Sequence, residues 1–460
     1  MAGIGFLLRK LNPHQSFGGL ARVYGAAGVI SSGPWLISIL GILLIGLWVK
    51  DEPQNATPVV QFQVSVTWLF AGSLILTGIL QFIFTRFIAD RIFEKKADRV
   101  APNLMGVLGL TTLVSGLLAA MVVLLGFGGE PLLYRVAMVA GFVLMSDIWM
   151  VVVLLSGLKA YRTIVLFFAL GYGVTVSASL GLRGHGLSGL LVGFLLGQAL
   201  LFFGLLGALL RDHPAQTLVR LDFLDRPLIH PSLAVTGLLY NLAIWSDKLV
   251  FWLTPSVSER VVGPLRASVV YDVPIFLAYL TIAPGMAVFL VRMETDFAEL
   301  YDAFYDMVRQ GATLESLERT RDNMIITVRQ GIYEIFKVQG LTLAVVVILG
   351  PRLLAALGIS PLYLPLFYID TVAVAAQVLF LAILNVLFYL DQRRLALILA
   401  AVFLVLNLGL TILTIQLGPS FYGYGFALAA GAVCFLGLGL LSRRLALLVQ
   451  ETFMLQSVAS

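Results

Sequence analysis

The chain has 460 residues, of which 60% are hydrophobic and only 12% are charged, and its mean hydropathy is +0.98. A soluble domain carries about 25% charged residues, and a soluble chain of this length needs far more polar surface to cover its core. The composition therefore excludes a soluble enzyme, a disordered protein and a disulfide-stapled secreted domain, and it predicts an integral membrane protein.

Twelve stretches of the chain are apolar and long enough for membrane-spanning helices, since a helix needs about 20 apolar residues to cross the hydrocarbon core. We therefore predict an all-α polytopic membrane protein. In chain order the predicted spans are 21–48, 63–88, 103–126, 134–156, 164–182, 187–210, 232–253, 267–291, 328–350, 364–390, 395–417 and 424–442.

The basic residues are distributed unevenly over the two sides of these spans. With a cytoplasmic N-terminus, 23 of the 30 Lys and Arg residues fall on the cytoplasmic side. Because short cytoplasmic loops are enriched in Lys and Arg, we predict that both termini are cytoplasmic. The net charge of +5 reflects this topology, and the dispersed basic residues lack the clustered patch that nucleic acid requires.

Two cytoplasmic connections are longer than the others. We predict an N-terminal six-helix bundle over residues 1–210, a cytoplasmic linker over 211–231 and a C-terminal six-helix bundle over 232–460. The second long connection, 292–330, belongs to this C-terminal half. Two six-helix halves around a midplane cavity are the usual layout of secondary transporters.

Prolines interrupt two of the predicted spans. The first span contains the run Ser31-Ser32-Gly33-Pro34-Trp35, and the eighth contains Pro274 and Pro284. Proline removes a backbone hydrogen bond and exposes carbonyl groups, which a cavity or a hydroxyl must then satisfy. These breaks predict cavity-lining or moving segments, and a simple packing kink is the alternative.

Five charged residues lie inside predicted spans: Asp147, Asp247, Lys248, Asp272 and Asp370. Charge within a membrane is expensive, so each residue is a candidate for a substrate pathway; structural pairing between helices is the alternative. Adjacent residues of a helix point about 100° apart, which predicts that Asp247 and Lys248 pair with other helices rather than with each other. The predicted cavity residues are Asp147, Asp247, Lys248, Asp272, Asp370, Ser31, Ser32, Trp35, Trp245 and Tyr271.

The segment 292–330 holds eight of the chain's 25 acidic residues, and its apolar residues recur at helical spacing. A helix that lies on a membrane surface usually has a basic polar face, so this acidic one is predicted to pack on the transporter or on a cytoplasmic protein. A solvated helical extension is the alternative. The predicted partner-binding residues are Glu294, Asp296, Glu299, Asp302 and Asp306.

Sequence features of catalysis are missing. The chain contains no nucleotide-binding glycine loop, nucleophile elbow or HExxH motif. Its single cysteine, Cys434, forms no intramolecular disulfide, and its four histidines do not share a helical face at metal-ligand spacing. We therefore expect no enzyme, no cofactor and no metal site.

Several motifs resemble those of a known family. The opening Met1-Ala-Gly-Ile-Gly-Phe6 with Arg9-Lys10, the run Gly28–Trp35, and the motifs Trp245-Ser-Asp-Lys248 and Tyr271-Asp-Val-Pro274 are similar to the inner-membrane Pel exopolysaccharide transporter family, the G component of the Pel system. The resemblance covers essentially the whole chain, including its length and its twelve predicted spans.

This resemblance implies a fold similar to multidrug exporters and lipid-linked oligosaccharide flippases, with two six-helix bundles in a V shape. It implies a substrate that is a partly deacetylated, cationic amino-sugar polymer, moved across the bacterial inner membrane and surrounded by membrane lipids. It also implies three protein partners: a cytoplasmic glycosyltransferase and two further inner-membrane Pel components, one of them a cyclic-di-GMP receptor.

Other functions on the same kind of fold remain open from the residues alone. One is an ion-coupled antiporter of small drugs, in which Asp147 or Asp370 binds a proton or sodium; another is a lipid-linked oligosaccharide flippase. A second twelve-helix transporter superfamily has a loop signature that Ala89-Asp90-Arg91 and Lys95-Lys96 echo, but the glycines of that signature are missing.

Overall fold

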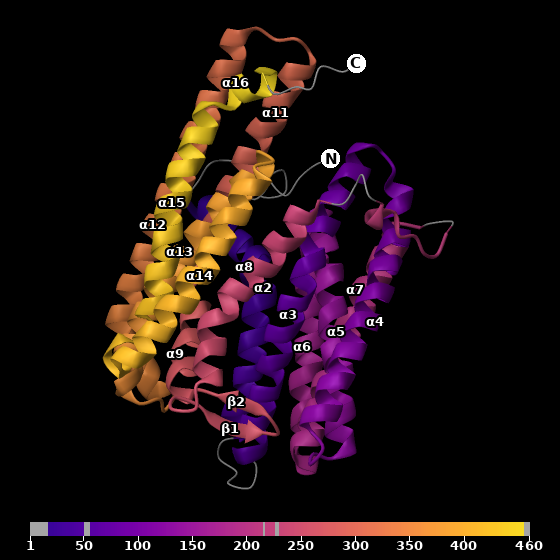
Figure 1. Cartoon of the computed structure of the whole chain (residues 1–460), viewed down its shortest axis with the longest axis vertical. Helices are drawn as coiled ribbons and strands as arrows, with labels where there is room; N and C mark the ends of the chain where they lie inside the picture. The colour runs from indigo at the N-terminus through magenta and orange to yellow at the C-terminus, as the bar shows by residue number, and fades with distance from the viewer. Residues whose placement is uncertain (1–16, 50–55, 215–216, 226–229, 455–460) are drawn as a thin grey trace. The chain divides into compact units, whose positions relative to one another are not determined.

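Long helices make up nearly all of the described chain in a computed structural model (Figure 1). The structure describes residues 17–49, 56–214, 217–225 and 230–454. The opening motif Met1–Phe6 with Arg9 and Lys10 lies outside the described residues, as do residues 215–216 and 226–229 of the predicted linker.

The chain divides into two compact units, one of residues 33–272 and one of residues 1–32 with 273–460. Both boundaries fall inside proline-containing helices, directly before Gly33-Pro34 and before Val273-Pro274. The helix over Pro231–Leu253 therefore groups with the N-terminal helices, whereas the sequence-based division places it in the C-terminal half. Each unit is described by itself below.

The unit of residues 33–272 is a helical bundle with one small β-hairpin. In it, α3 packs on α5 and α8, α4 packs on α5, and α6 packs on α7. Its elements are the second half of α2 (Phe17–Val49), α3 (Ala56–Phe93), η1 (Ala97–Arg99), α4 (Val100–Gly126), α5 (Leu132–Gly157), α6 (Tyr161–Gly181), η2 (Arg183–His185), α7 (Gly186–Asp212), η3 (Asp222–Leu224), α8 (Pro231–Leu253), β1 (Glu259–Val262), β2 (Leu265–Ala267) and the start of α9 (Val269–Leu280).

Glycine sets the distance between α3 and α8. A Cβ atom at Gly237 would lie 2.0 Å from the carbonyl oxygen of Gly78, and one at Gly78 would lie 2.7 Å from that of Gly237. Real Cβ atoms are excluded at such distances, so only glycine lets these two backbones touch. The contact fixes α8, which carries Asp247 and Lys248, against α3.

The β-hairpin between α8 and α9 was not anticipated from the sequence. Its antiparallel strands pair Glu259 with Ala267 and Arg260 with Arg266. Trp68 on α3 donates its Nε1 hydrogen to the carbonyl oxygen of Arg266 at 2.8 Å, and the guanidinium of Arg266 donates to the carbonyl oxygens of Ser258 at 2.6 Å and Trp252 at 3.2 Å. The hairpin thus ties α3 to α8.

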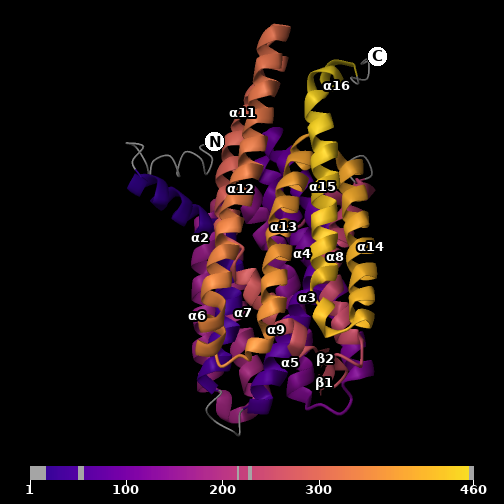
Figure 2. The same cartoon turned by 90° about the vertical axis from the view of Figure 1, so that its left-hand side faces the viewer.

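The other unit is also helical, and one of its helices is much longer than a membrane is thick. The 43 residues of α12 extend for about 65 Å at 1.5 Å per residue, against a hydrocarbon core of about 30 Å. In Figure 2, α11 and the first part of α12 extend beyond the neighbouring ends of α13 and α14. After α9, the elements are α10 (Ala283–Val291), the π-helix η5 (Arg292–Phe297), α11 (Ala298–Arg309), α12 (Leu314–Ala356), η6 (Pro361–Tyr363), α13 (Leu364–Tyr389), α14 (Arg393–Leu417), η7 (Pro419–Phe421), α15 (Tyr424–Ala446) and α16 (Leu448–Met454).

A helix lies at each of the twelve predicted spans, but twelve membrane crossings are not confirmed. Within the described ranges, ten helices are long and apolar enough to cross a membrane, and the bent pair formed by α9 with the helical stretch Ala283–Arg309 makes an eleventh if it is one span. The helix left out is α8, whose 23 residues include Asn241, Asp247 and Lys248. The predicted cytoplasmic location of both termini is not tested by the structure and stays a prediction.

Single-cysteine labelling tests this orientation, because the natural Cys434 is buried and its thiol lies 3.0 Å from the carbonyl oxygen of Ala376. We expect Arg260→Cys, in the hairpin, to react with a membrane-impermeant maleimide in intact cells stripped of their outer membrane. Gln310→Cys, between α11 and α12, should react only after permeabilisation. Both variants are made in a Cys434→Ala background, and the opposite labelling pattern would overturn the orientation.

Candidate functional site

The five charged residues predicted inside the membrane all lie in helices of the structure. Asp147 is in α5, Asp247 and Lys248 are in α8, Asp272 is in α9 and Asp370 is in α13. Four of them are buried, with at most 4% of the residue exposed, and Asp272 is half-buried. Their hydrogen-bond partners differ, and they show which of these side chains are fully hydrogen-bonded and which only partly.

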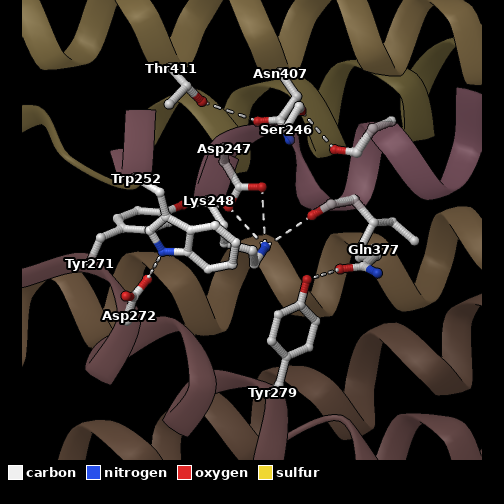
Figure 3. Close-up of polar contacts among 12 residues, drawn as sticks. Ser246, Asp247, Lys248, Trp252, Tyr271, Asp272, Tyr279, Gln377, Asn407 and Thr411 are labelled. Atoms are coloured by element: carbon white, nitrogen blue, oxygen red, sulfur yellow. Dashed lines mark hydrogen bonds and ion pairs between the residues drawn. The ribbon is translucent and has the colours of Figure 1, made fainter. Parts of the chain in front are cut away.

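Asp247 and Lys248 form an ion pair with each other. Lys248 Nζ lies 2.9 Å from Asp247 Oδ2 and 3.1 Å from Oδ1, and it also donates to the carbonyl oxygen of Ile244 at 3.0 Å (Figure 3). The expectation that neighbours in one helix cannot pair is wrong. The flexible four-carbon stem of lysine folds back along the helix toward Ile244, which brings its ammonium group over the preceding residue.

Tyr271 completes the bonding of this pair. Its hydroxyl donates to Asp247 Oδ2 at 2.7 Å, and its ring stacks on Phe251 with centroids 3.9 Å apart. Lys248 Nζ lies 6.0 Å from the ring centroid of Trp245. The structure therefore brings Asp247, Lys248 and the predicted aromatic residues Trp245 and Tyr271 together in one buried cluster.

Asp272 has a bonding pattern of its own at the start of α9. Its Oδ1 accepts a hydrogen bond from Trp252 Nε1 at 2.7 Å, and its Oδ2 accepts one from the backbone N–H of Ser268 at 3.0 Å. The second bond satisfies a backbone donor at the helix N-terminus, as a capping carboxylate does. Trp252 in turn packs on Trp68, with ring centroids 4.8 Å apart. Asp272 thus joins α8 to α9.

Asp147 is buried and only partly bonded. Its Oδ2 accepts a hydrogen bond from Thr112 Oγ1 of α4 at 2.7 Å, while its Oδ1 has no hydrogen-bond partner among the described residues. Only 4% of the residue is exposed. A carboxylate in this setting carries a desolvation cost that one hydroxyl does not offset.

Asp370 lies against the start of α15, in the unit of residues 273–460. A Cβ atom at Gly423 would lie 2.9 Å from Asp370 Oδ1, and Gly423 adopts φ +83° at the N-cap position of α15. The N-terminus of a helix carries partial positive charge, so it favours a carboxylate at this place. The position of Asp370 beside this helix N-terminus therefore suits a carboxylate.

The serines before Pro34 are bonded within their own helix. Ser31 Oγ donates to the carbonyl oxygen of Ala27 at 2.7 Å, and Ser32 Oγ donates to that of Gly28 at 2.6 Å. Trp35, after the proline, packs edge-on against Phe70 with centroids 6.5 Å apart. Such back-bonding is the usual way in which a membrane helix satisfies a serine.

The three predicted helix breaks have different surroundings in the structure. Pro34 and Pro274 lie inside α2 and α9, whereas Pro284 occupies the first turn of α10, where the missing N–H is not needed. The α9–α10 pair is bent by 41° at the break before α10.

The predicted partner-binding acids divide into two groups. Glu294 accepts hydrogen bonds from Asn385 Nδ2 at 2.6 Å and from the hydroxyl of Tyr389 at 3.3 Å. Arg292 joins Asp296 at 2.9 Å and Glu334 at 2.6 Å. Glu294 therefore holds η5 to α13, and Arg292, which Asp296 also bonds, holds η5 to α12 through Glu334. The other three predicted acids, Glu299, Asp302 and Asp306, are exposed.

Sequence reasoning missed two polar features. One is the Arg292–Glu334 pair, which joins residues 42 positions apart. The other is a group of uncharged side chains inside the unit of residues 33–272: Ser38, Tyr172, Thr175 and Gln198, each at most 2% exposed. The sequence signal for this group was Gln198, an amide in the middle of the apolar span 187–210. In the described part of the chain, no three His, Cys, Asp or Glu side chains are placed to hold a metal ion.

The chain matches a known protein family over nearly its whole length. Residues 1–453 match the sequence model of PelG, the exopolysaccharide exporter family EPS-E. No curated protein matches the chain. The resemblance found in the sequence motifs is confirmed by the family match.

Solved structures of MATE transporters share the fold. A MATE crystal structure in the straight conformation aligns with a TM-score of 0.65 at 14% identity, over 93% of this chain and 96% of that one. A MATE in complex with MaL6 aligns with a TM-score of 0.64 at 15% identity, over 92% and 97%. A MOP superfamily transporter from Pyrococcus furiosus aligns with a TM-score of 0.61 at 16% identity, over 92% and 96%. At these identities the likeness concerns the fold alone.

The ion pair in α8 makes a testable prediction about stability. Lys248→Met leaves the Asp247 carboxylate buried without its counter-ion, and such losses cost about 3–5 kcal/mol. The double variant Asp247→Asn/Lys248→Met removes both charges. We expect its free energy of unfolding to lie within about 1 kcal/mol of that of the natural protein. Thermal unfolding of the purified protein in detergent measures both.

The matched control is Lys337→Met, since Lys337 is exposed on α12 and lies 4.6 Å from the ring centroid of Tyr333. It should shift the unfolding temperature little. Equal stability of Lys248→Met and the natural protein would contradict the buried ion pair.

Proposed function

Because the chain belongs to the PelG family of exopolysaccharide exporters, we propose that it carries a partly deacetylated, cationic amino-sugar polymer across the bacterial inner membrane. The family match and the MATE-like fold make it a multi-pass membrane transporter and not an enzyme. The identity of the polymer, its membrane and its partners are parts of this proposal.

The observation that carries the proposal is the buried cluster of Asp247, Lys248 and Asp272 with its aromatic shell. Two carboxyl groups lie with one ammonium group in this cluster, which favours a cationic sugar over an anionic one. Trp245, Trp252 and Tyr271 lie around these charges. Aromatic faces with a few placed polar groups are the usual lining of a small-molecule site.

The cluster is closed in the structure, because its charged groups are bonded within the protein: Asp247 and Lys248 to each other, and Asp272 to Trp252. Substrate amines and hydroxyls would exchange with these internal bonds when the pathway opens. A carboxylate that bonds Lys248 here accepts a sugar ammonium equally well, since both are NH3⁺-type donors. The internal pair thus keeps Asp247 neutralised between substrates.

Energy for export is proposed to come from polymer synthesis by a partner glycosyltransferase, since the sequence has no nucleotide-binding loop. The complex would include two further inner-membrane Pel components, one of them a cyclic-di-GMP receptor. The exposed acids Glu299, Asp302 and Asp306 of α11 are the proposed docking residues for the cytoplasmic partner. Glu294 and Asp296 support this surface from behind through their bonds to Asn385 and Arg292.

The double variant Asp247→Asn/Lys248→Met tests the pathway, because it removes the charges while keeping the fold. We expect secreted polymer to fall at least tenfold at unchanged protein level in the membrane. Polymer is measured in the medium with a lectin, and protein by immunoblot. Lys337→Met is the control and should secrete normally. Normal secretion by the double variant would remove this cluster from the substrate pathway.

Ion-coupled antiport of small drugs is a second candidate, and Asp147 is the observation that favours it. Its Oδ1 is buried without a hydrogen-bond partner among the described residues, so it is placed to take up a proton. A similar structure is described as a multidrug resistance MATE family transporter. Asp370 is the weaker candidate, since the N-terminus of α15 accounts for its position.

Asp147→Asn tests this candidate, since asparagine mimics the protonated acid and keeps the bond from Thr112. An Asp147-coupled exporter would lose the pH dependence of transport, measured between pH 6 and 8 in proteoliposomes with a fluorescent drug or with the polymer. Thr112→Val is the matched variant that retains the acid. Unchanged pH dependence in Asp147→Asn would rule out coupling at this residue. Accumulation of a lipid-linked intermediate after loss of the protein would instead identify a flippase.

A further inference from the structure

The connection between α7 and α8 carries a patch of exposed apolar side chains. Its described part, residues 217–225, contains the short turn η3 and otherwise irregular backbone. Leu218 is 86% exposed, Val219 59%, Leu221 48% and Leu224 42%. Four exposed apolar side chains within seven positions are costly to leave in water, and such patches mark interaction surfaces.

Specific contacts hold this segment against α4. The backbone N–H of Arg220 donates to the carbonyl oxygen of Pro102 at 2.9 Å, and Asn103 Nδ2 donates to Asp222 Oδ2 at 3.2 Å. A Cβ atom at Gly106 would lie 2.0 Å from the carbonyl oxygen of Arg220, so only glycine admits the segment at this place. The segment is therefore a packed part of the unit of residues 33–272.

The segment lies on the side of α4 that faces lipid. Gly106 shares a helical face with Leu113, Leu117 and Leu124, because spacings of 7, 11 and 18 residues return to within about 20° of the same direction. These three leucines are 60–67% exposed, and they belong to an apolar helix that is long enough to cross a membrane. The apolar patch of the segment therefore continues the lipid-facing surface of α4.

The level of the segment along α4 matches the edge of the hydrocarbon core. The 27 residues of α4 are about 40 Å long, so a core of about 30 Å centred on this helix ends about three residues from each terminus. Pro102 and Asn103, which bond the segment, lie at that edge.

The neighbouring helix α3 indicates the same level. Phe223 of η3 is fully buried, and its ring packs on Phe84 and Phe87 with centroids 5.8 and 6.4 Å apart. Arg86, between these two phenylalanines in the sequence, is the first charged residue of α3 and pairs with Asp90 at 3.2 Å. Because charge is costly within the hydrocarbon core, this turn of α3 marks its boundary with the headgroups.

We propose that residues 217–225 form an interfacial membrane segment, in which Leu218, Val219, Leu221 and Leu224 insert among the acyl chains of the bilayer next to the headgroups. The occupant of the patch is phospholipid, because the patch continues the lipid-facing leucines of α4 at the depth where acyl chains begin. Irregular backbone is stable there, since headgroups and water bond its N–H and C=O groups, as the centre of a membrane cannot. The segment thus fastens the connection between α7 and α8 to the membrane.

Spin labelling measures the depth of this segment. Leu218→Cys is made in the Cys434→Ala background, labelled with a nitroxide and reconstituted as the full-length protein in vesicles of phosphatidylethanolamine and phosphatidylglycerol. Because Leu218 is 86% exposed, its replacement leaves the packing of the unit intact. Collisions of the label with oxygen, which concentrates among acyl chains, are compared with collisions with a water-soluble nickel chelate.

Two further variants give the reference values. Leu117→Cys places the label on the lipid-facing side of α4, and Gln310→Cys places it at an exposed position between α11 and α12. We expect the Leu218 label to meet nickel roughly fivefold less often than the Gln310 label, because the segment lies about 5–10 Å into the boundary between headgroups and acyl chains. It should lie nearer to the headgroups than the Leu117 label.

Two results would overturn the proposal. Nickel access at Leu218 equal to that at Gln310 would place the segment in water. Poor access of both oxygen and nickel would show that protein covers the patch.

A second comparison tests whether Leu218 anchors the segment. With the label at Leu224→Cys, the added change Leu218→Asp should raise nickel collisions about twofold or more, since a carboxylate withdraws from acyl chains. Leu218→Ile is the matched control and should leave the Leu224 label unchanged. An unaffected label in Leu218→Asp would contradict anchoring by Leu218. Neither measurement involves the polymer, so the proposed function and the lipid contact stand or fall separately.

Discussion

The hydrocarbon core of a membrane gives a polar group no water to bond, so every such group must be satisfied by the protein or by what the protein binds. Most of this chain obeys that constraint with helices, whose backbones bond internally. The serines of α2 return their hydrogens to carbonyls of the same helix, as Ser31 does to Ala27. Lys248 obeys it with three acceptors, two on Asp247 and one on Ile244.

Under this constraint, the hydrogen bonds that a buried charged residue makes say more about its function than its mere presence in the membrane does. Asp272 and Asp370 each lie beside a helix N-terminus, in α9 and α15 respectively. Asp247 is satisfied by Lys248 and Tyr271. Asp147 differs because Thr112 bonds only one of its oxygens. In the sequence these four acids are alike, because each is a rare charged residue in an apolar span. Their hydrogen bonds in the structure distinguish them.

The helices were predictable from sequence because each needs only a local run of apolar residues. Helices occupy all twelve predicted spans, although α8 falls outside the apolar set that the structure supports as membrane-crossing. The β-hairpin was not predictable, since its strands are three to four residues long and one of them is bonded by Trp68, which lies far away in the sequence on α3. A contact between residues far apart in the sequence leaves no local sequence pattern from which a strand could be predicted.

The candidate site was predictable in its residues but not in its bonding. Periodicity placed Asp247 and Lys248 about 100° apart around a helix, which describes Cβ directions and ignores the reach of a lysine side chain. Gln198 was not predicted, because the candidate residues inside the spans were chosen by charge and an amide is uncharged. A neutral amide costs less to bury than an ion but still requires partners, so it indicates a polar contact between helices, here with Tyr172.

Fold similarity at 14–16% identity constrains the arrangement of helices and leaves the chemistry of the interior to this chain's own residues. Within residues 33–272 that chemistry has two kinds: an acid-rich aromatic cluster around Lys248, and uncharged groups around Gln198. A partly deacetylated polymer presents cationic and neutral sugar units along one chain. A carboxylate bonds the ammonium group of a deacetylated unit, whereas an amide bonds the hydroxyl groups that both kinds of unit carry. Under the proposed function, the two chemistries would bind the two kinds of group that such a polymer presents, ammonium and hydroxyl, so their pairing suits a polymer of mixed composition better than a small drug.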